Sequence, residues 1–130
     1  MIDINELSIN SLVSYKGKMT CRIAEIHKTW VKIDNGTGQY WDINNLDDLQ
    51  PIELTFDIIQ KNNFVYYDKE CYWLTENVCI DCTGKVYAQH KSETYDGRWL
   101  FDSIELCQCK YVHQLQALLK LLNVDKNIQV

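Results

Sequence analysis

Cysteines in the second half of the chain have the spacing that most directly suggests chemistry. Cys79 and Cys82 stand in a C-x-x-C arrangement, and Cys107 and Cys109 follow in a C-x-C arrangement. Thiolates spaced in this way are able to hold a tetrahedral zinc ion. Two features argue against a metal: Cys79 lies within an expected strand and so points away from Cys82, and no glycine-rich knuckle surrounds Cys107. We therefore expect thiols that pack as small apolar side chains, with neither a metal nor another cofactor.

Histidines and carboxylates form no recognisable catalytic motif in the sequence. His27, His90 and His113 are scattered without a linking pattern, which favours surface or edge positions. A calcium loop beginning at Asp34 would need Glu at its twelfth position, where the chain has Asn45. Phosphate loops, nucleophile elbows and dinucleotide-binding fingerprints are also missing from the sequence. The sequence thus predicts a protein that is not an enzyme.

Aromatic side chains are the more informative group. The chain has more of them than one small core holds, namely Trp30, Tyr40, Trp41, Tyr66, Tyr67, Tyr72, Trp73, Tyr87, Tyr95 and Trp99. Neighbouring aromatic residues in a strand place one ring on each face of a sheet. The outer rings then form a partner surface, a base-stacking platform or oligomer contacts, or they fill a second small core beneath a helix. The sequence leaves these alternatives open.

A small-ligand site in such a protein would combine stacking rings with cations that bind phosphate. The candidate rings are those of Trp41, Trp73 and Trp99. The candidate cations are Arg22, Lys85 and Arg98. These residues form the predicted ligand-binding set, and the ligand that they would suit is a nucleotide.

Length and charge restrict the class of protein. The chain has 130 residues, of which 46% are apolar and 24% charged, as expected for one globular domain or one domain with a small module. Residues 1–54 hold five basic and eight acidic residues, a net charge of −3, and residues 55–130 hold eight and ten, a net charge of −2. Repulsion by phosphate disfavours double-stranded DNA as a partner. Because no apolar run of membrane-spanning length occurs, we predict a cytoplasmic protein with reduced thiols and no membrane partner.

Residues 1–54 are expected to form a small β-barrel-like subdomain. Alternating strands are predicted over 12–16, 19–27, 30–33 and 39–43. The segment Asp34–Gly38 contains Asn-Gly and is the strongest hairpin signal in the chain. Residues 44–49 are expected to form a helical turn, which Pro51 ends. This order is typical of an antiparallel meander of the small Tudor-like or Src-homology-like kind.

Residues 55–130 are expected to form a helix, antiparallel strands and a second helix. Thr55 is suited to cap the first helix, and a polar loop is expected over 91–98. Strands are predicted over 64–67, 71–74, 78–81, 85–89 and 99–106. The fold class is therefore α+β, with the barrel-like meander followed by a short helix, antiparallel strands and a C-terminal amphipathic helix packed on the sheet.

The C-terminal helix is predicted over residues 111–123. Its apolar stripe consists of Tyr111, Val112, Leu115, Leu118, Leu119 and Leu122. His113, Gln116, Lys120 and Asn123 lie on the opposite side, where we expect them to be solvated. A helix of this length depends on burying its stripe, because about three turns are marginal alone in water.

Two segments carry a resemblance to a known group of proteins. They are Leu49-Gln-Pro-Ile-Glu-Leu-Thr55 with Ile58-Ile-Gln-Lys-Asn-Asn-Phe64, and Tyr111-Val-His-Gln-Leu-Gln116 with Leu118-Leu119. With the barrel-like start, the chain resembles small uncharacterised proteins encoded by phages and mobile elements of Bacteroidetes. That group usually has Asn-Gly where this chain has Asn62-Asn63, and the cysteines are not part of its pattern. The resemblance implies no catalytic residue.

The expected function is that of a non-enzymatic binding protein, encoded by a phage or mobile element, that binds a host or phage component. One alternative is a sponge-type anti-defence protein that sequesters a nucleotide immune signal through the predicted ligand-binding set. Another is a single-stranded nucleic-acid binding module that uses the barrel face. Exposed aromatic rings are also compatible with a homo-oligomer.

Overall fold

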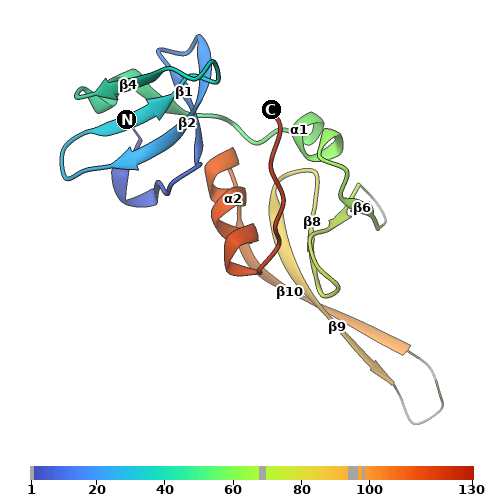
Figure 1. Cartoon of the computed structure of the whole chain (residues 1–130). Coiled ribbons are helices and arrows are strands. Elements are labelled where there is room, and N and C mark those ends of the chain that lie inside the picture. The colour runs from blue at the N-terminus through green and yellow to red at the C-terminus, as the bar shows by residue number, and fades with distance from the viewer. Residues whose placement is uncertain (1, 68–69, 94–96, 98) are drawn as a thin grey trace. The chain divides into compact units, whose positions relative to one another are not determined.

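The computed structural model describes residues 2–67, 70–93, 97 and 99–130, with the backbone alone at 90–93 and 99–102. The chain divides into two compact units. The first unit contains residues 1–53 and 111–120, and the second contains residues 54–110 and 121–130. Each unit has one five-stranded antiparallel sheet, so the fold class is α+β as predicted (Figure 1).

The first unit begins with a meander of short strands. Its elements are η1 (Ile4–Glu6), β1 (Leu12–Tyr15), β2 (Met19–Ile26), β3 (Val31–Asp34), β4 (Tyr40–Ile43), η2 (Leu46–Asp48) and β5 (Leu49–Pro51). The strand order is β4-β3-β2-β1-β5. The Asn-Gly hairpin is confirmed: the Asp34 carboxylate accepts the Gly36 N–H, and Gly36 has φ +87°. The predicted helical turn before Pro51 is also confirmed.

Alternation along these strands places apolar side chains on one face of the first sheet. The buried cluster comprises Ile2, Leu7, Val13, Cys21, Ile23, Val31, Ile33, Ile43 and Leu49. On the same face, the rings of Tyr15 on β1 and Trp41 on β4 meet with their centroids 5.7 Å apart. A flat sheet would hold those strands roughly 14 Å apart, so this sheet curls strongly. However, β4 and β5 remain its edges, so the described strands form no closed barrel.

The C-terminal helix α2 (Val112–Leu121) is confirmed as an element. It contacts β1 of the first sheet through its polar side. The Gln116 side chain makes this contact: its Oε1 accepts the Leu12 N–H at 2.8 Å and its Nε2 donates to the Asn10 carbonyl at 3.0 Å. His113, expected in solvent, is 1% exposed. Helical periodicity separates polar from apolar side chains but does not show which polar side chains find buried partners.

The second unit starts with α1 (Phe56–Lys61), whose predicted cap is confirmed because Thr55 Oγ1 accepts the Ile58 N–H. Its strands are β6 (Val65–Tyr66), β7 (Tyr72–Trp73), β8 (Val78–Ile80), β9 (Lys85–Glu93) and β10 (Trp99–Gln108). The order β10-β9-β8-β7-β6 follows the chain, so β6 and β10 are the two edges.

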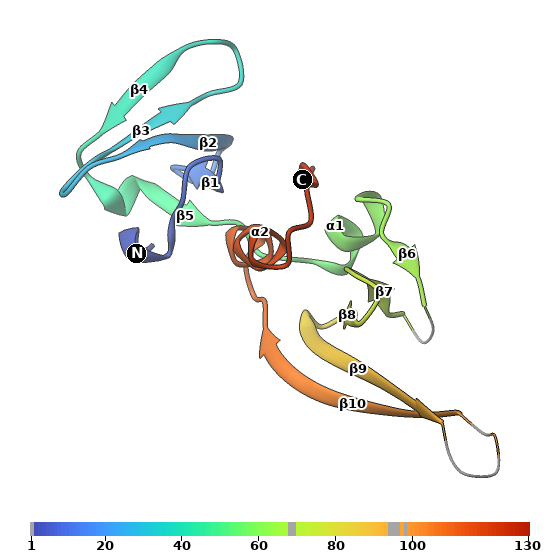
Figure 2. The same ribbon diagram turned by 60° about the horizontal axis from the view of Figure 1, so that its bottom comes forward.

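Strands β9 and β10 are longer than predicted. The polar segment 91–93, expected in a loop, continues β9. Because β8 pairs only with residues 86–88, the rest of the hairpin extends beyond the sheet as a two-stranded ribbon (Figure 2). A ribbon paired on one side only does not need the apolar alternation of a sheet that covers a core, so composition suggested a loop.

The C-terminal tail is fixed within the second unit by a buried asparagine. Asn62 Nδ2 donates to the carbonyls of Ile58 at 2.6 Å and Gln129 at 2.9 Å, and Asn62 Oδ1 accepts the Gln129 N–H at 2.7 Å. Asn62 is 4% exposed, and Ile128, which precedes Gln129 in the tail, is 1% exposed. The tail thus behaves as a packed element of the unit, although it has neither helix nor strand structure.

Candidate binding surface on the second sheet

One face of the second sheet carries a row of residues that crosses all its strands. The register pairs Val65 with Trp73, Trp73 with Cys79, Cys79 with Tyr87, and Tyr87 with Glu105. Paired residues in antiparallel strands point to the same face, so we call this row and its face the aromatic–acidic face. The alternate row contains Ile80 and Val86, both of which are fully buried, and therefore belongs to the core.

A pocket of about 440 Å³ lies at the β6–β7 end of this face, lined by Val65, Trp73, Leu74, Thr75 and Glu76. Val65 is 69% exposed although its side chain is apolar. The Trp73 ring is held in place by Tyr67, with centroids 4.5 Å apart and planes at 55°. The pocket thus combines an aromatic wall with the carboxylate of Glu76, which is exposed.

The tight turn after β7 positions the polar side of this pocket. Thr75 Oγ1 accepts the N–H groups of Asn77 at 3.2 Å and Val78 at 3.1 Å. The Leu74 N–H also donates to the Val78 carbonyl at 2.7 Å. A hydroxyl that satisfies successive N–H groups stabilises such a turn. Glu76 therefore lies at the tip of a turn with a defined backbone, and it lines the same pocket as Trp73.

Acidic groups dominate the electrostatics along the rest of the face. Tyr87 OH donates to Asp81 Oδ2 at 3.4 Å. Burial raises the pKa of Tyr87, and the charges of Asp81 and Glu105 raise it further. Burial also acts to raise the pKa of Asp81, but hydrogen bonds from Thr83 and from the Lys85 N–H outweigh it and lower that pKa overall. The Asp81 carboxylate thus stays charged and adds to a negative field around Tyr87.

The structure separates the members of the predicted ligand-binding set. Arg22 and Trp41 belong to the first unit, and Trp73 and Lys85 to the second. Within the first sheet, Arg22 pairs with Asp34, whereas Trp41 pairs with Ile33 on the opposite, core face. Arg22 Nη1 donates to the Asn10 carbonyl at 3.4 Å.

In the second sheet, Trp73 and Lys85 share the aromatic–acidic face, but they are two strands and two residues apart, which corresponds to roughly 12 Å. Arg98 lies outside the described residues, and Trp99 is described only as the first residue of β10. Of the members of the predicted set whose side chains the structure describes, Trp73 lines the pocket described above, and Arg22, Trp41 and Lys85 do not.

The cysteines proposed as zinc ligands differ widely in exposure. Cys79 and Cys109 are buried, Cys82 is half-buried and Cys107 is exposed. Within the described ranges, no three Cys, His, Asp or Glu side chains come together as a metal site would require. Burial raises the pKa of the Cys109 thiol to about 12, with a further contribution from Cys107. A hydrogen bond with Glu70 raises the pKa of Cys82.

Because burial disfavours ionisation of a thiol, we predict that the first unit loses stability in alkali. Burial, with a smaller contribution from Asp34, raises the pKa of Cys21 to about 11, whereas an unfolded thiol ionises near pH 8.5. The folded state therefore favours the neutral thiol, so its stabilisation is complete below about pH 8.5 and is lost as the pH rises through 11. We expect urea midpoints of the first unit to fall above pH 9, and to fall less steeply in Cys21→Ala. Equal pH slopes would contradict this prediction.

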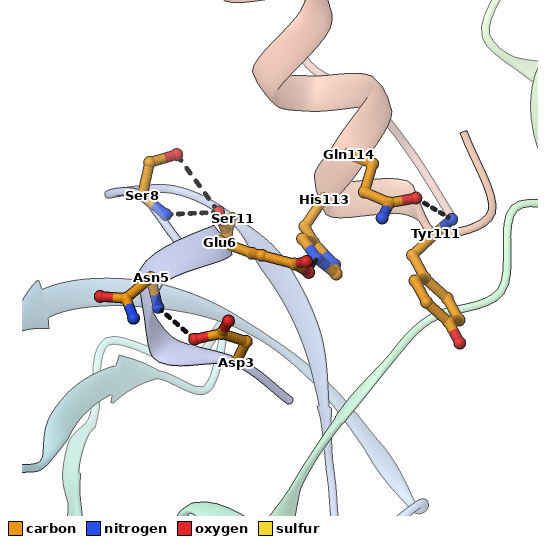
Figure 3. Close-up of polar contacts among 8 residues, drawn as sticks. All are labelled: Asp3, Asn5, Glu6, Ser8, Ser11, Tyr111, His113 and Gln114. Carbon is orange, nitrogen blue, oxygen red and sulfur yellow. Dashed lines mark hydrogen bonds and ion pairs between the residues drawn. The ribbon is translucent and has the colours of Figure 1, made fainter. Parts of the chain in front are cut away.

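His113 and Glu6 form a histidine–carboxylate pair in the first unit (Figure 3). His113 Nε2 lies 3.3 Å from Glu6 Oε2, and its ring stacks on Tyr111 with centroids 5.8 Å apart. Its Nδ1 is buried without a hydrogen-bond partner, so no hydroxyl or thiol in the described part of the chain is placed for activation. The nearby hydroxyls of Ser8 and Ser11 lie 3.3 Å from each other instead. This polar pair therefore joins α2 to η1 and forms no catalytic arrangement among the described residues.

Sequence reasoning missed Val65, Thr75 and Glu76. Their importance comes from a pocket between two short strands and a turn, which no residue spacing reveals. The one local signal was Thr75, because a threonine followed by Glu-Asn and an apolar strand is typical of a turn stabilised by a hydroxyl group.

Comparison of the chain with protein-family models, curated proteins and solved structures finds no match. Of the helices in the described ranges, none has the length and apolar character that crossing a bilayer requires.

Proposed function

We propose that this chain is a non-enzymatic, cytoplasmic binding protein, encoded by a phage or mobile element, that binds a host or phage protein. The observation that carries the proposal is the pocket on the aromatic–acidic face. Trp73 and Val65 supply an apolar wall, and Glu76 supplies a carboxylate at the rim. A lysine or arginine side chain fits this combination, because its stem packs on apolar surface while its charged head meets the ring and the carboxylate.

Charge favours a protein partner over the alternatives. Glu76 is the only charged residue among the described residues that line the pocket, and the chain has a net charge of −5. A nucleotide phosphate or a nucleic-acid backbone would meet repulsion there. The sponge-type and single-stranded nucleic-acid hypotheses therefore serve as competing outcomes of the test.

The test is an NMR titration of the protein with N-acetyl-arginine methylamide, ADP-ribose and an oligothymidylate. We expect the arginine derivative to shift the indole N–H signal of Trp73. Trp73→Leu should weaken its binding by about tenfold, because the cation loses its aromatic partner. Glu76→Gln should weaken binding less at high salt than at low salt, because exposed charges are screened.

Tyr40→Leu is the matched control, because Tyr40 is an aromatic residue that is 59% exposed in the first unit. Binding by this variant should equal that of the unaltered chain. Saturable binding of ADP-ribose, or a salt-steep affinity for the oligothymidylate, would overturn the proposal in favour of the corresponding alternative.

A further inference from the structure

The outer edge of β10 is an unprotected strand edge. β10 has ten residues and stands last in the order of its sheet, with no described strand on its far side. Residues 103–108 are all exposed, among them Ile104 at 62% and Leu106 at 51%. Natural sheets often guard such an edge with lysine, proline or a bulge; residues 99–108 contain no lysine or proline, and the bulge lies beyond Glu105.

Hydrogen bonding in the hairpin shows which backbone groups of β10 point outward. The Gln89 N–H donates to the Asn77 carbonyl, on the β8 side of β9. Residues of an antiparallel strand alternate in the side to which they direct their N–H and C=O groups, so Ala88 bonds toward β10. Its partner Ile104 therefore bonds toward β9, and the neighbouring Ser103 and Glu105 direct their groups away from the sheet.

Beyond Glu105 a bulge shifts this alternation by one residue. The bulge falls between Glu105 and Cys107, and the Cys109 N–H donates to the Gly84 carbonyl on the β9 side. Residues 99–105 are therefore a regular stretch that is able to accept another strand without rearrangement.

The charge of β10 indicates what that other strand would carry. Residues 99–108 include Asp102 and Glu105 and no lysine, arginine or histidine. Glu105 points to the aromatic–acidic face, beside Tyr87 and close enough to Asp81 for both charges to act on that tyrosine. Opposite charges placed across strands stabilise a pair, and like charges destabilise it.

We infer that the free edge of β10 binds an extended segment of another protein, in which basic residues alternate with apolar ones, as an added antiparallel strand. A basic side chain then lies opposite Glu105 and an apolar one opposite Ile104 on the other face. The outward N–H and C=O groups of Ser103 and Glu105 supply the backbone hydrogen bonds. This inference is independent of the pocket on β6–β7, because the two features lie at opposite edges of the sheet.

The experiment selects binders to the full chain from a displayed library of random nine-residue peptides. We expect enriched peptides to alternate basic and apolar residues and to bind more weakly as salt increases. Ser103→Pro should lower their affinity by about tenfold or more, because it removes an outward N–H and places a ring at the edge. The ladder to β9 does not use that N–H, so the fold should be retained.

Ser103→Ala is the matched control. Both substitutions remove the hydrogen bond from Ser103 Oγ to Gln89 Oε1, but only proline removes the outward N–H. Glu105→Lys is the second variant. It should lower the affinity for basic peptides and raise the affinity for acidic ones, because it reverses the charge of the side chain without altering the backbone groups of the edge. Equal binding by Ser103→Pro and Ser103→Ala, or indifference to Glu105→Lys, would overturn the inference. Concentration-dependent dimerisation that Ser103→Pro abolishes would also overturn it, because the occupant would then be a second copy of this chain.

Discussion

Replacing Gly84 with alanine should destabilise the second unit by about 3–5 kcal/mol, which is among the largest effects expected of a single methyl group. Gly84 lies in the turn between β8 and β9 and has φ +87°, a conformation that costs an alanine about 1–2 kcal/mol. In addition, an added Cβ would overlap the carbonyl oxygen of Cys109. The backbones approach closely here because the Cys109 N–H donates to the Gly84 carbonyl at 2.8 Å.

Gly36→Ala separates the two causes of this effect. Gly36 also has φ +87°, but an added Cβ would meet nothing within 4 Å. Its substitution should therefore cost only the conformational part, about 1–2 kcal/mol. Native-state hydrogen exchange provides the measurement, with amides of β8 and β9 reporting on Gly84 and amides of β3 and β4 reporting on Gly36. If Gly84→Ala lowers the free energy of unfolding by no more than Gly36→Ala does, the close approach to Cys109 contributes nothing to the cost of the substitution.

Replacing Asn62 with alanine should destabilise the second unit by about 2–4 kcal/mol. The substitution removes the hydrogen bonds that satisfy the N–H and C=O of Gln129 and the carbonyl of Ile58. Asn62 is 4% exposed, so water does not readily replace its amide. Loss of the tail would also expose Ile128, which is 1% exposed in the folded chain.

The control for this prediction is Gln129→Ala. Gln129 binds Asn62 through its backbone, and its side chain is exposed, so this change should alter the stability by less than about 0.5 kcal/mol. Urea denaturation followed by circular dichroism gives both values. Exchange of the Gln129 amide should accelerate in Asn62→Ala before the whole unit unfolds. Equal stability of the two variants would show that the tail is not fixed through Asn62.

Local signals in the sequence predicted local structure well. The Asn-Gly hairpin, the Thr55 cap and the C-terminal amphipathic helix depend on residues within one or two turns of each other. Backbone preference and helical periodicity act over that range, so each element is encoded where it forms.

Contacts between residues that are far apart in the sequence were not predictable in the same way. His113 and Gln116 appear polar on a helical wheel, yet Gln116 binds the backbone of β1 and His113 packs beside Glu6. The partners that satisfy a buried polar group are separated here by more than a hundred residues, as with Leu12 and Gln116. Composition contains no record of such pairs, which is also why Glu76 and Val65 were missed as pocket residues.

The path of the chain through the two units has a consequence for biosynthesis. Residues 1–53 are completed by residues 111–120, and all the strands of the second sheet lie between those segments. Gln116, which binds the Leu12 N–H and the Asn10 carbonyl, leaves the ribosome only after the five strands of the second sheet have been translated. The first unit therefore stays incompletely packed until residues 111–120 have been translated. A chaperone that holds nascent chains would have its main opportunity during that interval.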